Sequence, residues 1–472
     1  MKLTSYGATR EVTGSKHLLE VNGKKILLDC GMFQGRRKEA AEKNHNLPID
    51  PAGIDHIIVS HAHMDHTGSL PTYVKNGYAN EIISTHATRD LSSYMLADSA
   101  YIQEREAEYL TERKREFIEP LYNMEDVTKT INNFATIGYH VRHEVTPGVW
   151  LTYYDAGHIL GSAQIYLEID DHDDDNKRKT LYFTGDLGRK GLPILRDPEL
   201  IREADFIISE CTYGNRFHKY IVDVDDHFER VINETVNRGG KVIIPAFALE
   251  RTQEVVYHLH LLMNQKRIPE IPIFVDSPLA CNVTTVFKSH PECYDKEIYE
   301  EFIKQNDNPF GFDRLKYITD VQDSKNLNNL KQPAIIISAS GMMEHGRVLH
   351  HLKNNIENPA NTIMVVGYQA AYTLGRQIIE GQKVVKILGK SYKNNAQVEI
   401  MDAFSGHADR SDLINHLSYF DPKPKQIFLV HGEEGQGLTF KEILEELDYT
   451  GVTVSEFGVG YDLKFARSTT FL

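Results

Sequence analysis

The chain lacks the features that would place it across a membrane or in an oxidising compartment. Its 472 residues contain no run of about 18 apolar residues, which excludes a transmembrane helix. Residues 1–7 lack the apolar region of a signal peptide. The four cysteines form no CxxC pair, so nothing indicates a disulfide framework or a thiolate zinc site. We therefore expect an intracellular, cytoplasmic protein with no membrane partner.

The chain also has little positive charge, with 52 Lys and Arg against 67 Asp and Glu and a net charge of −15. Because phosphate contacts need Lys and Arg, this balance argues against nucleic-acid binding through a field spread over the whole surface. A polyanionic substrate would instead be attracted locally, by metal ions and by a basic strip. Residues 383–393, with four lysines, are a candidate strip. A solvated strand or sheet edge explains these lysines equally well.

What the chain does contain is a cluster of metal-binding side chains in the run His61-Ala62-His63-Met64-Asp65-His66. The preceding residues 57–60 are typical of a short buried strand, so three imidazoles and a carboxylate crowd one turn at its end. Side chains two residues apart point the same way on an extended chain, as His61 and His63 would. Imidazole and carboxylate are ligands for divalent metals. One loop could thus serve two ions, although a polar surface loop is the alternative.

Three later segments repeat this pattern, in which an apolar strand stops at a ligand-type residue beside glycine. They place His158, Asp186 and His431 at strand ends, where glycine lets backbone and ligand approach closely. Together with the first cluster they make a set of seven candidate ligands: His61, His63, Asp65, His66, His158, Asp186 and His431.

Seven ligands suit two metal ions. One ion would be held by three histidines, namely His61, His63 and His158. The other would be held by Asp65, His66 and His431. Asp186 can bridge the two, because a carboxylate has two oxygens. With no thiolate in the set, Zn²⁺ is the first expectation and Mn²⁺ the alternative. Two metals about 3.5–4 Å apart are suited to hydrolysing phosphate esters and amides.

The order of expected elements indicates one α/β domain inserted into another. Up to residue 213 the chain reads as strands and turns, with a hairpin at residues 16–29 and a long helical stretch at residues 91–121. Helices and strands then alternate, with a helix expected at residues 343–354, which is typical of a parallel α/β layout. The strand-and-turn pattern returns after about residue 386.

These motifs resemble the metallo-β-lactamase superfamily, and the inserted part resembles its β-CASP branch of RNA- and DNA-processing nucleases. The resemblance spans nearly the whole chain. It implies an αββα sandwich at residues 1–208 and 386–472, with a β-CASP α/β domain inserted at residues 209–385. The matching motifs centre on Asp29, on the run from His61 to His66, and on His158, Asp186, Glu210, His407 and His431. A histidine at position 431 resembles the RNA-processing members.

The resemblance implies a role for each of these residues. Asp29 would orient the metal loop without binding metal. Glu210 and His407 would form an acid–base pair that protonates the leaving oxygen, and Asp65 would also move a proton from the attacking water. A phosphate or nucleotide would be bound by residues 403–407 and the loop at 340–341, through Ser405, Gly406, His407 and Ser340. The Ser340 loop could equally be a plain turn.

The preferred function is a two-metal ribonuclease acting on single-stranded RNA, as an endonuclease, a 5′-exonuclease or both. The alternatives are a DNA nuclease of the same branch, a thioester, lactone or β-lactam hydrolase, a flavin-linked di-iron protein, and a non-catalytic scaffold. The chain departs from the family at Ala371-Tyr372, where Glu-Gly is usual; the bulky Tyr372 could reshape the substrate channel. The sequence leaves open whether the chain forms a homodimer.

Overall fold

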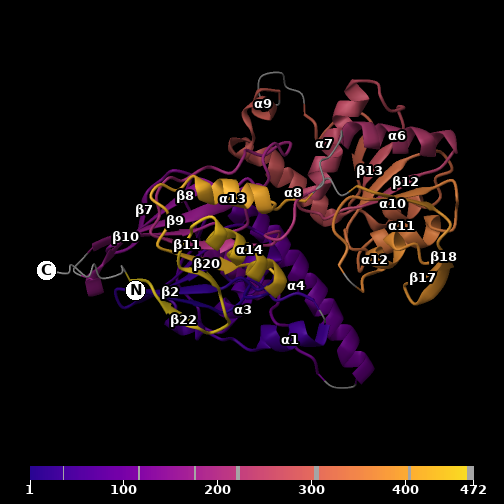
Figure 1. Ribbon diagram of the computed structural model, residues 1–472. Coiled ribbons are helices and arrows are strands. Elements are labelled where there is room, and N and C mark those ends of the chain that lie inside the picture. The colour runs from indigo at the N-terminus through magenta and orange to yellow at the C-terminus, as the bar shows by residue number, and fades with distance from the viewer. Residues whose placement is uncertain are drawn as a thin grey trace. The chain divides into compact units, whose positions relative to one another are not determined.

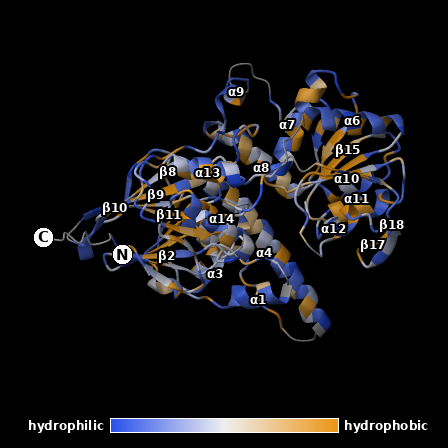
Figure 2. Ribbon diagram, in the orientation of Figure 1, coloured by the Kyte–Doolittle hydropathy of each residue, from blue (hydrophilic) through white to orange (hydrophobic). Residues whose placement is uncertain are grey.

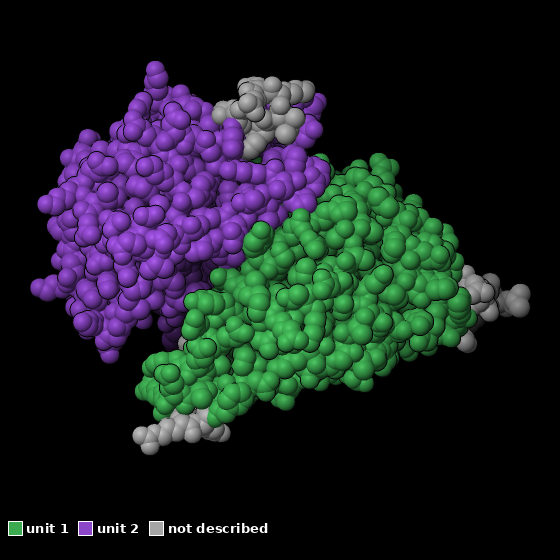
Figure 3. All heavy atoms as spheres, turned by 180° about the vertical axis from the view of Figure 1, so that it is seen from behind, with its two compact units in different colours: residues 1–217, 406–472 green, residues 218–405 purple. Residues whose placement is uncertain are grey.

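The structure is a computed structural model that describes residues 1–35, 37–114, 117–174, 177–218, 224–301, 308–370, 372–401 and 405–464. The chain forms two compact units, residues 1–217 with 406–472, and residues 218–405 (Figure 3). The boundaries between the units fall after residues 217 and 405. Both lie later in the chain than the boundaries at 208 and 385 that the sequence suggests. Among the described residues, no helix combines the length and apolar character needed to cross a membrane.

The first unit is built on two seven-stranded sheets. One sheet has the order β22-β1-β2-β3-β4-β5-β6. Its strands are β1 (Lys2–Ser5), β2 (His17–Val21), β3 (Lys24–Leu28), β4 (His56–Ile58), β5 (Ile82–Ser84), β6 (Phe134–Thr136) and β22 (Gly460–Asp462). The expected hairpin is β2–β3. Its two-residue turn, Asn22-Gly23, has positive φ at both residues, which matches the right-handed twist of the strands.

The other sheet of this unit has the order β21-β20-β11-β10-β9-β8-β7. Its strands are β7 (His143–Thr146), β8 (Val149–Asp155), β9 (Ala163–Asp171), β10 (Lys177–Phe183), β11 (Phe206–Glu210), β20 (Gln426–Val430) and β21 (Val452–Val454). Strand β11 pairs in parallel with both β10 and β20. This pairing joins the two separate stretches of chain that make the unit, and it brings the ends of these strands to one edge.

The two sheets pack face to face, with helices on both outer faces. Apolar side chains of both sheets share one core, among them Leu19 and Ile165. The helices of this unit are α1 (Arg37–His45), α2 (Met64–Thr67), α3 (Leu70–Lys75), α4 (His86–Lys114), α5 (Met124–Asn132), α13 (Arg410–Ser418) and α14 (Glu434–Glu446). Leu70 of α3 packs in the core outside the first sheet, and Leu413 and Phe440 in the core outside the second. The expected αββα sandwich is confirmed (Figure 1).

The second unit contains a parallel six-stranded sheet of order β14-β13-β15-β12-β16-β19. Its strands are β12 (Val242–Pro245), β13 (Ile273–Val275), β14 (Leu315–Tyr317), β15 (Ile335–Ser338), β16 (Thr362–Val365) and β19 (Gln397–Ile400). Strands buried on both faces are apolar throughout, as Figure 2 shows for β15. Because β19 pairs with β16, residues beyond 386 still belong to the inserted unit.

The helices of the second unit are α6 (Val224–Asn237), α7 (Arg251–Asn264), α8 (Pro278–Ser289), α9 (Lys296–Tyr299), α10 (Val321–Leu327), α11 (Val348–Asn355) and α12 (Leu374–Ile379). Among them α6 precedes the first strand of the sheet, and the later helices lie between its successive parallel strands. The expected helix at 343–354 begins only at Val348, because Met343 and Gly346 have positive φ, which a right-handed helix does not accept. Tyr372 also has a positive φ, 70°, a conformation that the family's usual glycine adopts freely. Ala371 lies outside the described residues.

A buried charge network holds the second unit together just after β13. Asp276 is fully buried and accepts hydrogen bonds from Arg347 (2.7 Å), Ser324 (2.6 Å) and His351 (2.5 Å). Ser324 lies on α10 and His351 on α11, so one carboxylate joins two helices to the sheet. Removing one partner of a buried ion pair leaves the other charge uncompensated, which costs about 3–5 kcal/mol.

We therefore expect Asp276→Ala to destabilise the second unit by about 3–5 kcal/mol. Hydrogen exchange measured by mass spectrometry should show that β13 and β15 lose protection, while β9 and β10 in the other unit keep theirs. Asp313→Ala is the matched control, because the Asp313 side chain is exposed. Unchanged protection of β13 and β15 in Asp276→Ala would contradict a structural role for the network.

Candidate metal centre

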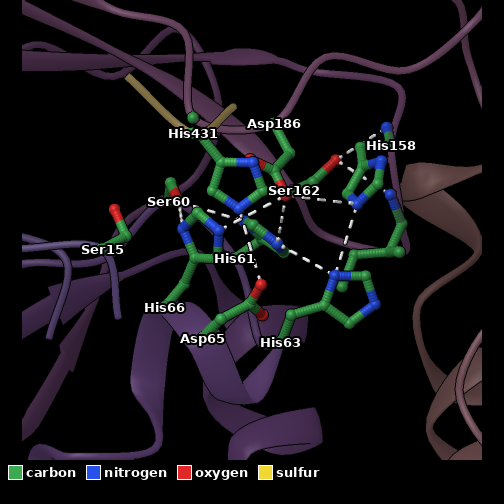
Figure 4. A network of polar contacts seen from close by, with 12 residues as sticks. Ser15, Ser60, His61, His63, Asp65, His66, His158, Ser162, Asp186 and His431 are labelled. Atoms are coloured by element: carbon green, nitrogen blue, oxygen red, sulfur yellow. Dashed lines mark hydrogen bonds and ion pairs between the residues drawn. The ribbon is translucent and has the colours of Figure 1, made fainter. Parts of the chain in front are cut away.

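The structure brings all seven candidate ligands together in the first unit (Figure 4). They form two groups, in each of which one donor atom per residue lies within 4.8 Å of the others, and Asp186 and His431 form a further group of this kind with His407. The first group contains three histidines and an aspartate: His61, His63, His158 and Asp186. The second contains Asp65, His66 and His431. Side chains far apart in the sequence thus converge on one small volume.

The first group presents imidazole nitrogens to one another at short range. Nδ1 of His63 lies 3.0 Å from Nε2 of His61 and 3.3 Å from Nε2 of His158. Burial, reinforced by the neighbouring imidazoles, lowers the pKa of His61 and His158. Burial likewise lowers that of His63 to about 4. These imidazoles are therefore neutral at pH 7, and a neutral imidazole offers the lone pair that binds a metal.

The second group is held by partners on its outer side. Nδ1 of His66 lies 2.6 Å from Oδ2 of Asp29, and Nδ1 of His431 lies 2.9 Å from Oγ1 of Thr212. Hydrogen bonds of this kind fix ring orientation in metal sites. Burial raises the pKa of Asp65, but the adjacent His431 and His66 lower it further than burial raises it. Asp65 is therefore a carboxylate.

Asp186 lies between the two groups. Its Oδ2 is 3.5 Å from Nε2 of His61, 3.3 Å from Nε2 of His66 and 3.7 Å from Nε2 of His158. Its Oδ1 is 3.5 Å from Nδ1 of His431. The side chain is 1% exposed, and the histidines around it hold its pKa below the usual range although burial raises it. One buried carboxylate thus faces both groups.

Three donor atoms of these groups have no hydrogen-bond partner among the described residues. They are Nε2 of His66, Oδ1 of Asp186 and Nε2 of His431. A buried polar atom without a partner costs about 1–3 kcal/mol, and all three atoms belong to residues of the two groups. Two divalent cations bound there would satisfy them, so the donor set fits hard or borderline metals such as Zn²⁺.

Asp29 anchors the loop that carries the first ligands. The residue sits at the end of β3 with φ 60°, and its Oδ1 accepts a hydrogen bond from the amide of Ser60 (2.8 Å). Its Oδ2 accepts one from the Ser60 hydroxyl (2.9 Å). A Cβ on the nearby Gly31 would lie 1.5 Å from the carbonyl oxygen of Asp65, so only glycine lets these loops meet. The structure therefore places Asp29 beside the ligands, where it was expected.

Glu210 and His407 form a pair next to the ligands. Nδ1 of His407 lies 3.4 Å from both carboxylate oxygens of Glu210 and 3.9 Å from Oδ2 of Asp186. Glu210 is fully buried at the end of β11, and its Oε1 accepts a hydrogen bond from the amide of Leu187 (2.6 Å). Burial lowers the pKa of His407, but the two carboxylates raise it to about 10. The two carboxylates thus favour the protonated form of His407 beside the candidate ligands.

The remaining expected site residues are only partly brought to this centre. The Gly406 carbonyl accepts a hydrogen bond from Nδ1 of His158 (2.9 Å), which orients a ligand and was not foreseen. Ser405 and Ser340 belong to the second unit, and the Ser340 hydroxyl accepts a hydrogen bond from the amide of Glu344 within its own loop. Residues 402–404, part of the expected nucleotide pocket, lie outside the described residues.

Sequence reasoning also missed the hydroxyl groups that position the ligands. Ser60 contacts Asp29, and Thr212 contacts His431. Ser162 accepts a hydrogen bond from the backbone amide of His158 (3.0 Å). Ser60 directly precedes the run from His61 to His66, and this position could have indicated its role. Thr212 gives no such signal, because only the parallel pairing of β11 with β20 brings it to His431.

Family profiles match three parts of the chain. A profile described as the metallo-beta-lactamase superfamily matches residues 14–215, and one described as the Beta-Casp domain matches residues 252–378. A third, described as a Zn-dependent metallo-hydrolase RNA specificity domain, matches residues 391–454.

Characterised proteins are similar along almost the whole chain. Ribonuclease TTHA0252 of Thermus thermophilus is 34% identical over 467 residues, with 98% of this chain and 99% of that protein covered. Transcription termination factor FttA of Methanosarcina mazei is 32% identical over 444 residues, with 92% of this chain and 67% of that protein covered. A solved structure of a protein of unknown function from Enterococcus faecalis V583 matches with a TM-score of 0.56. It covers 98% of this chain and 99% of that chain at 13% identity, which supports the fold alone.

Proposed function

Because the chain belongs to the β-CASP branch of the metallo-β-lactamase superfamily, we propose that it is a ribonuclease that hydrolyses phosphodiester bonds of single-stranded RNA. The family expected from the motifs is confirmed. An RNA substrate is supported by the profile match to an RNA specificity domain and by the similarity to a ribonuclease over 98% of the chain. The mode of cleavage, internal or from the 5′ end, stays open.

The observation that carries the proposal is the arrangement of seven donors in two groups around Asp186. His61, His63 and His158 would hold one ion, and Asp65, His66 and His431 the other, with Asp186 shared. Two zinc ions at this centre would supply an acidified water as nucleophile and would neutralise charge on the phosphate. Zn²⁺ is preferred to Mn²⁺ because five of the seven candidate ligands are histidines, and imidazole is a common zinc ligand.

The residues around the ions would handle protons and hold the substrate. Asp65 is a carboxylate within the second group, and it would accept a proton from the attacking water. His407 carries a proton and would donate it to the leaving oxygen, with Glu210 holding its ring. Phosphate binding by Ser405, Gly406 and Ser340 stays a prediction.

The alternative functions are less well supported. A hydrolase of thioesters, lactones or β-lactams has no need for the acid–base pair Glu210–His407 or for an RNA specificity domain. A scaffold without activity has no need for a full set of ligands. DNA is the alternative substrate that the same chemistry would accept, and it is therefore one arm of the test. The homodimer stays a prediction, which light scattering of the purified chain measures.

The test is the cleavage of 5′-labelled single-stranded RNA by the zinc-loaded protein, beside DNA of the same sequence. We expect RNA cleavage that falls by at least ~10²-fold in Asp65→Asn, because the variant loses a ligand and a proton acceptor. Asp448→Asn is the matched control, since Asp448 is exposed. Release of mononucleotides indicates an exonuclease and internal fragments an endonuclease. Equal cleavage by Asp65→Asn and the parent, or cleavage of DNA alone, would refute the proposal.

A further inference from the structure

The second unit carries a basic hairpin that lies outside its main sheet. Strands β17 (Val384–Ile387) and β18 (Lys390–Lys393) pair only with each other. Their connection, Leu388-Gly389, has positive φ at both residues, as a tight two-residue turn requires. This element, residues 383–393, is called the lysine hairpin below.

One face of the lysine hairpin is anchored in the core of its unit. Val385 and Ile387 are 1% exposed and belong to the apolar cluster beneath, against which Tyr392 also packs. The backbone adds two anchors, because the amide of Lys393 donates to Glu357 (3.0 Å) and that of Asn394 to the carbonyl of Lys383 (2.9 Å). The hairpin is therefore a rigid base for whatever its exposed side chains bind.

The exposed side chains of the hairpin are mainly lysines. All four lysines, Lys383, Lys386, Lys390 and Lys393, are exposed. No ion pair of these four occurs within the part of the chain that the structure describes. The carboxylates nearest in sequence are otherwise engaged, because Glu380 pairs with Arg376 at 2.6 Å and Glu399 with Arg230 at 2.9 Å. Glu357 accepts the amide of Lys393.

This cluster is unusual for a chain with a net charge of −15. Lysines on the edges of a small sheet also deter pairing with other chains. Lys386 and Lys393 lie on the face of the hairpin opposite to Val385 and Ile387, because side chains alternate between the two faces of a strand. Lys383 precedes β17 and Lys390 begins β18, so these two lysines lie near the two ends of the hairpin. A flexible polyanion can contact charges that are spread in this way, whereas a compact anion would need them to converge.

We propose that the lysine hairpin is a docking surface for the phosphate backbone of single-stranded RNA. The proposal rests on the proposed function, because RNA is the polyanion that this chain is argued to cleave. Its positive charge complements the strand, and Lys contacts with phosphates position nucleic acid without reading its sequence. The hairpin thus provides a locally basic surface for RNA on a protein whose overall negative charge repels RNA.

The test measures binding of a labelled oligouridylate by fluorescence anisotropy across a salt series, with chelator present so that no cleavage occurs. The variant replaces Lys383, Lys386, Lys390 and Lys393 with glutamine. Each lost phosphate contact reduces the slope of log affinity against log salt by about 0.7 for a single strand. We expect a slope reduced by roughly 2–3 and affinity at low salt at least about ten-fold weaker.

The matched control replaces four exposed lysines of the same unit, Lys266, Lys316, Lys325 and Lys331, with glutamine. It changes the net charge equally and should leave the slope near that of the parent. An equal loss in both variants, or a parental slope in the hairpin variant, would overturn the proposal. A DNA oligomer should give the same slope change, since lysines contact phosphates. Anionic vesicles should not bind, and binding lost with the lysines would indicate a membrane surface instead.

The outcome separates this proposal from the function on which it rests. If the parent cleaves RNA and the hairpin variant binds RNA as well as the parent does, the docking surface alone is refuted. A parent that binds RNA through the hairpin and fails to cleave it refutes the nuclease alone. Thermal melting of both lysine variants checks that the fold is retained, because all eight replaced side chains are exposed.

Discussion

Replacing Asp186 with asparagine is expected to reduce metal content from about two ions to about one per chain and to lower kcat for RNA by at least about 10³-fold. The amide has nearly the volume of the carboxylate, so packing around it should persist. It carries no negative charge, however, and only one of its two polar atoms can accept a metal. The side chain can then no longer serve as a ligand of both ions.

The size of this effect follows from the environment of Asp186. The side chain is 1% exposed, and its Oδ1 has no hydrogen-bond partner among the described residues. Charge interactions in such a buried place are much stronger than in water. A loss of about 4 kcal/mol of transition-state stabilisation corresponds to about 10³-fold in rate, which is what a metal-centred charge effect commonly supplies.

Mass spectrometry of the native protein and plasma emission spectroscopy measure the metal content, and the RNA assay measures kcat. Asp448→Asn is the control, since Asp448 is exposed and has a φ of 61°, which asparagine accepts. A variant that keeps two ions and parental kcat would show that Asp186 does not bridge. A variant that loses its fold, as judged by thermal melting, can be replaced by Asp186→Glu, which keeps the charge and should retain part of the metal.

The grouping of the seven candidate ligands was predictable from the sequence because its signals are local. His61, His63, Asp65 and His66 occupy one loop, and the strand before it can be recognised from four apolar or small residues. His158, Asp186 and His431 each follow an apolar run beside glycine. Strand ends on one edge of a sheet are neighbours in space, so the pattern of strand, glycine and ligand carries three-dimensional information.

The parts that were not predictable depend on contacts between distant segments. The hydroxyl of Thr212 reaches His431 only through the pairing of β11 with β20. The lysine hairpin and β19 look like the strand-and-turn pattern of the first unit, yet β19 pairs with β16 in the second. The start of α11 was placed too early because Met343 has a left-handed backbone. The residue type gives no sign of this conformation, since it is not a glycine.

Replacing His407 with alanine is expected to lower kcat for RNA by about 10²–10⁴-fold, the range typical of a lost general acid. The same variant should hydrolyse bis(p-nitrophenyl) phosphate at nearly the parental rate. The leaving oxygen of RNA is strongly basic and needs a proton as the bond breaks, whereas p-nitrophenolate is a weak base that leaves without one. The two substrates therefore separate proton donation from every other role.

The geometry around His407 explains why a proton is held there. Glu210 lies 3.4 Å from Nδ1 and Asp186 lies 3.9 Å from it, and together they raise the pKa of His407 to about 10 against the effect of burial. Glu210→Gln removes one of these charges, so the pKa of His407 falls and a smaller fraction is protonated at any given pH. We expect this variant to show the same substrate pattern as His407→Ala, with a smaller loss that is least at low pH.

The measurement compares kcat on the two substrates for the parent, His407→Ala, Glu210→Gln and the control His172→Ala, whose side chain is exposed. Metal content should stay at the parental value in all four, because His407 is assigned to no ion in the proposed ligand set. Equal losses of His407→Ala on RNA and on the nitrophenyl ester would contradict proton donation. They would place His407 among the groups that hold the ions or the phosphate, since those act on both substrates alike.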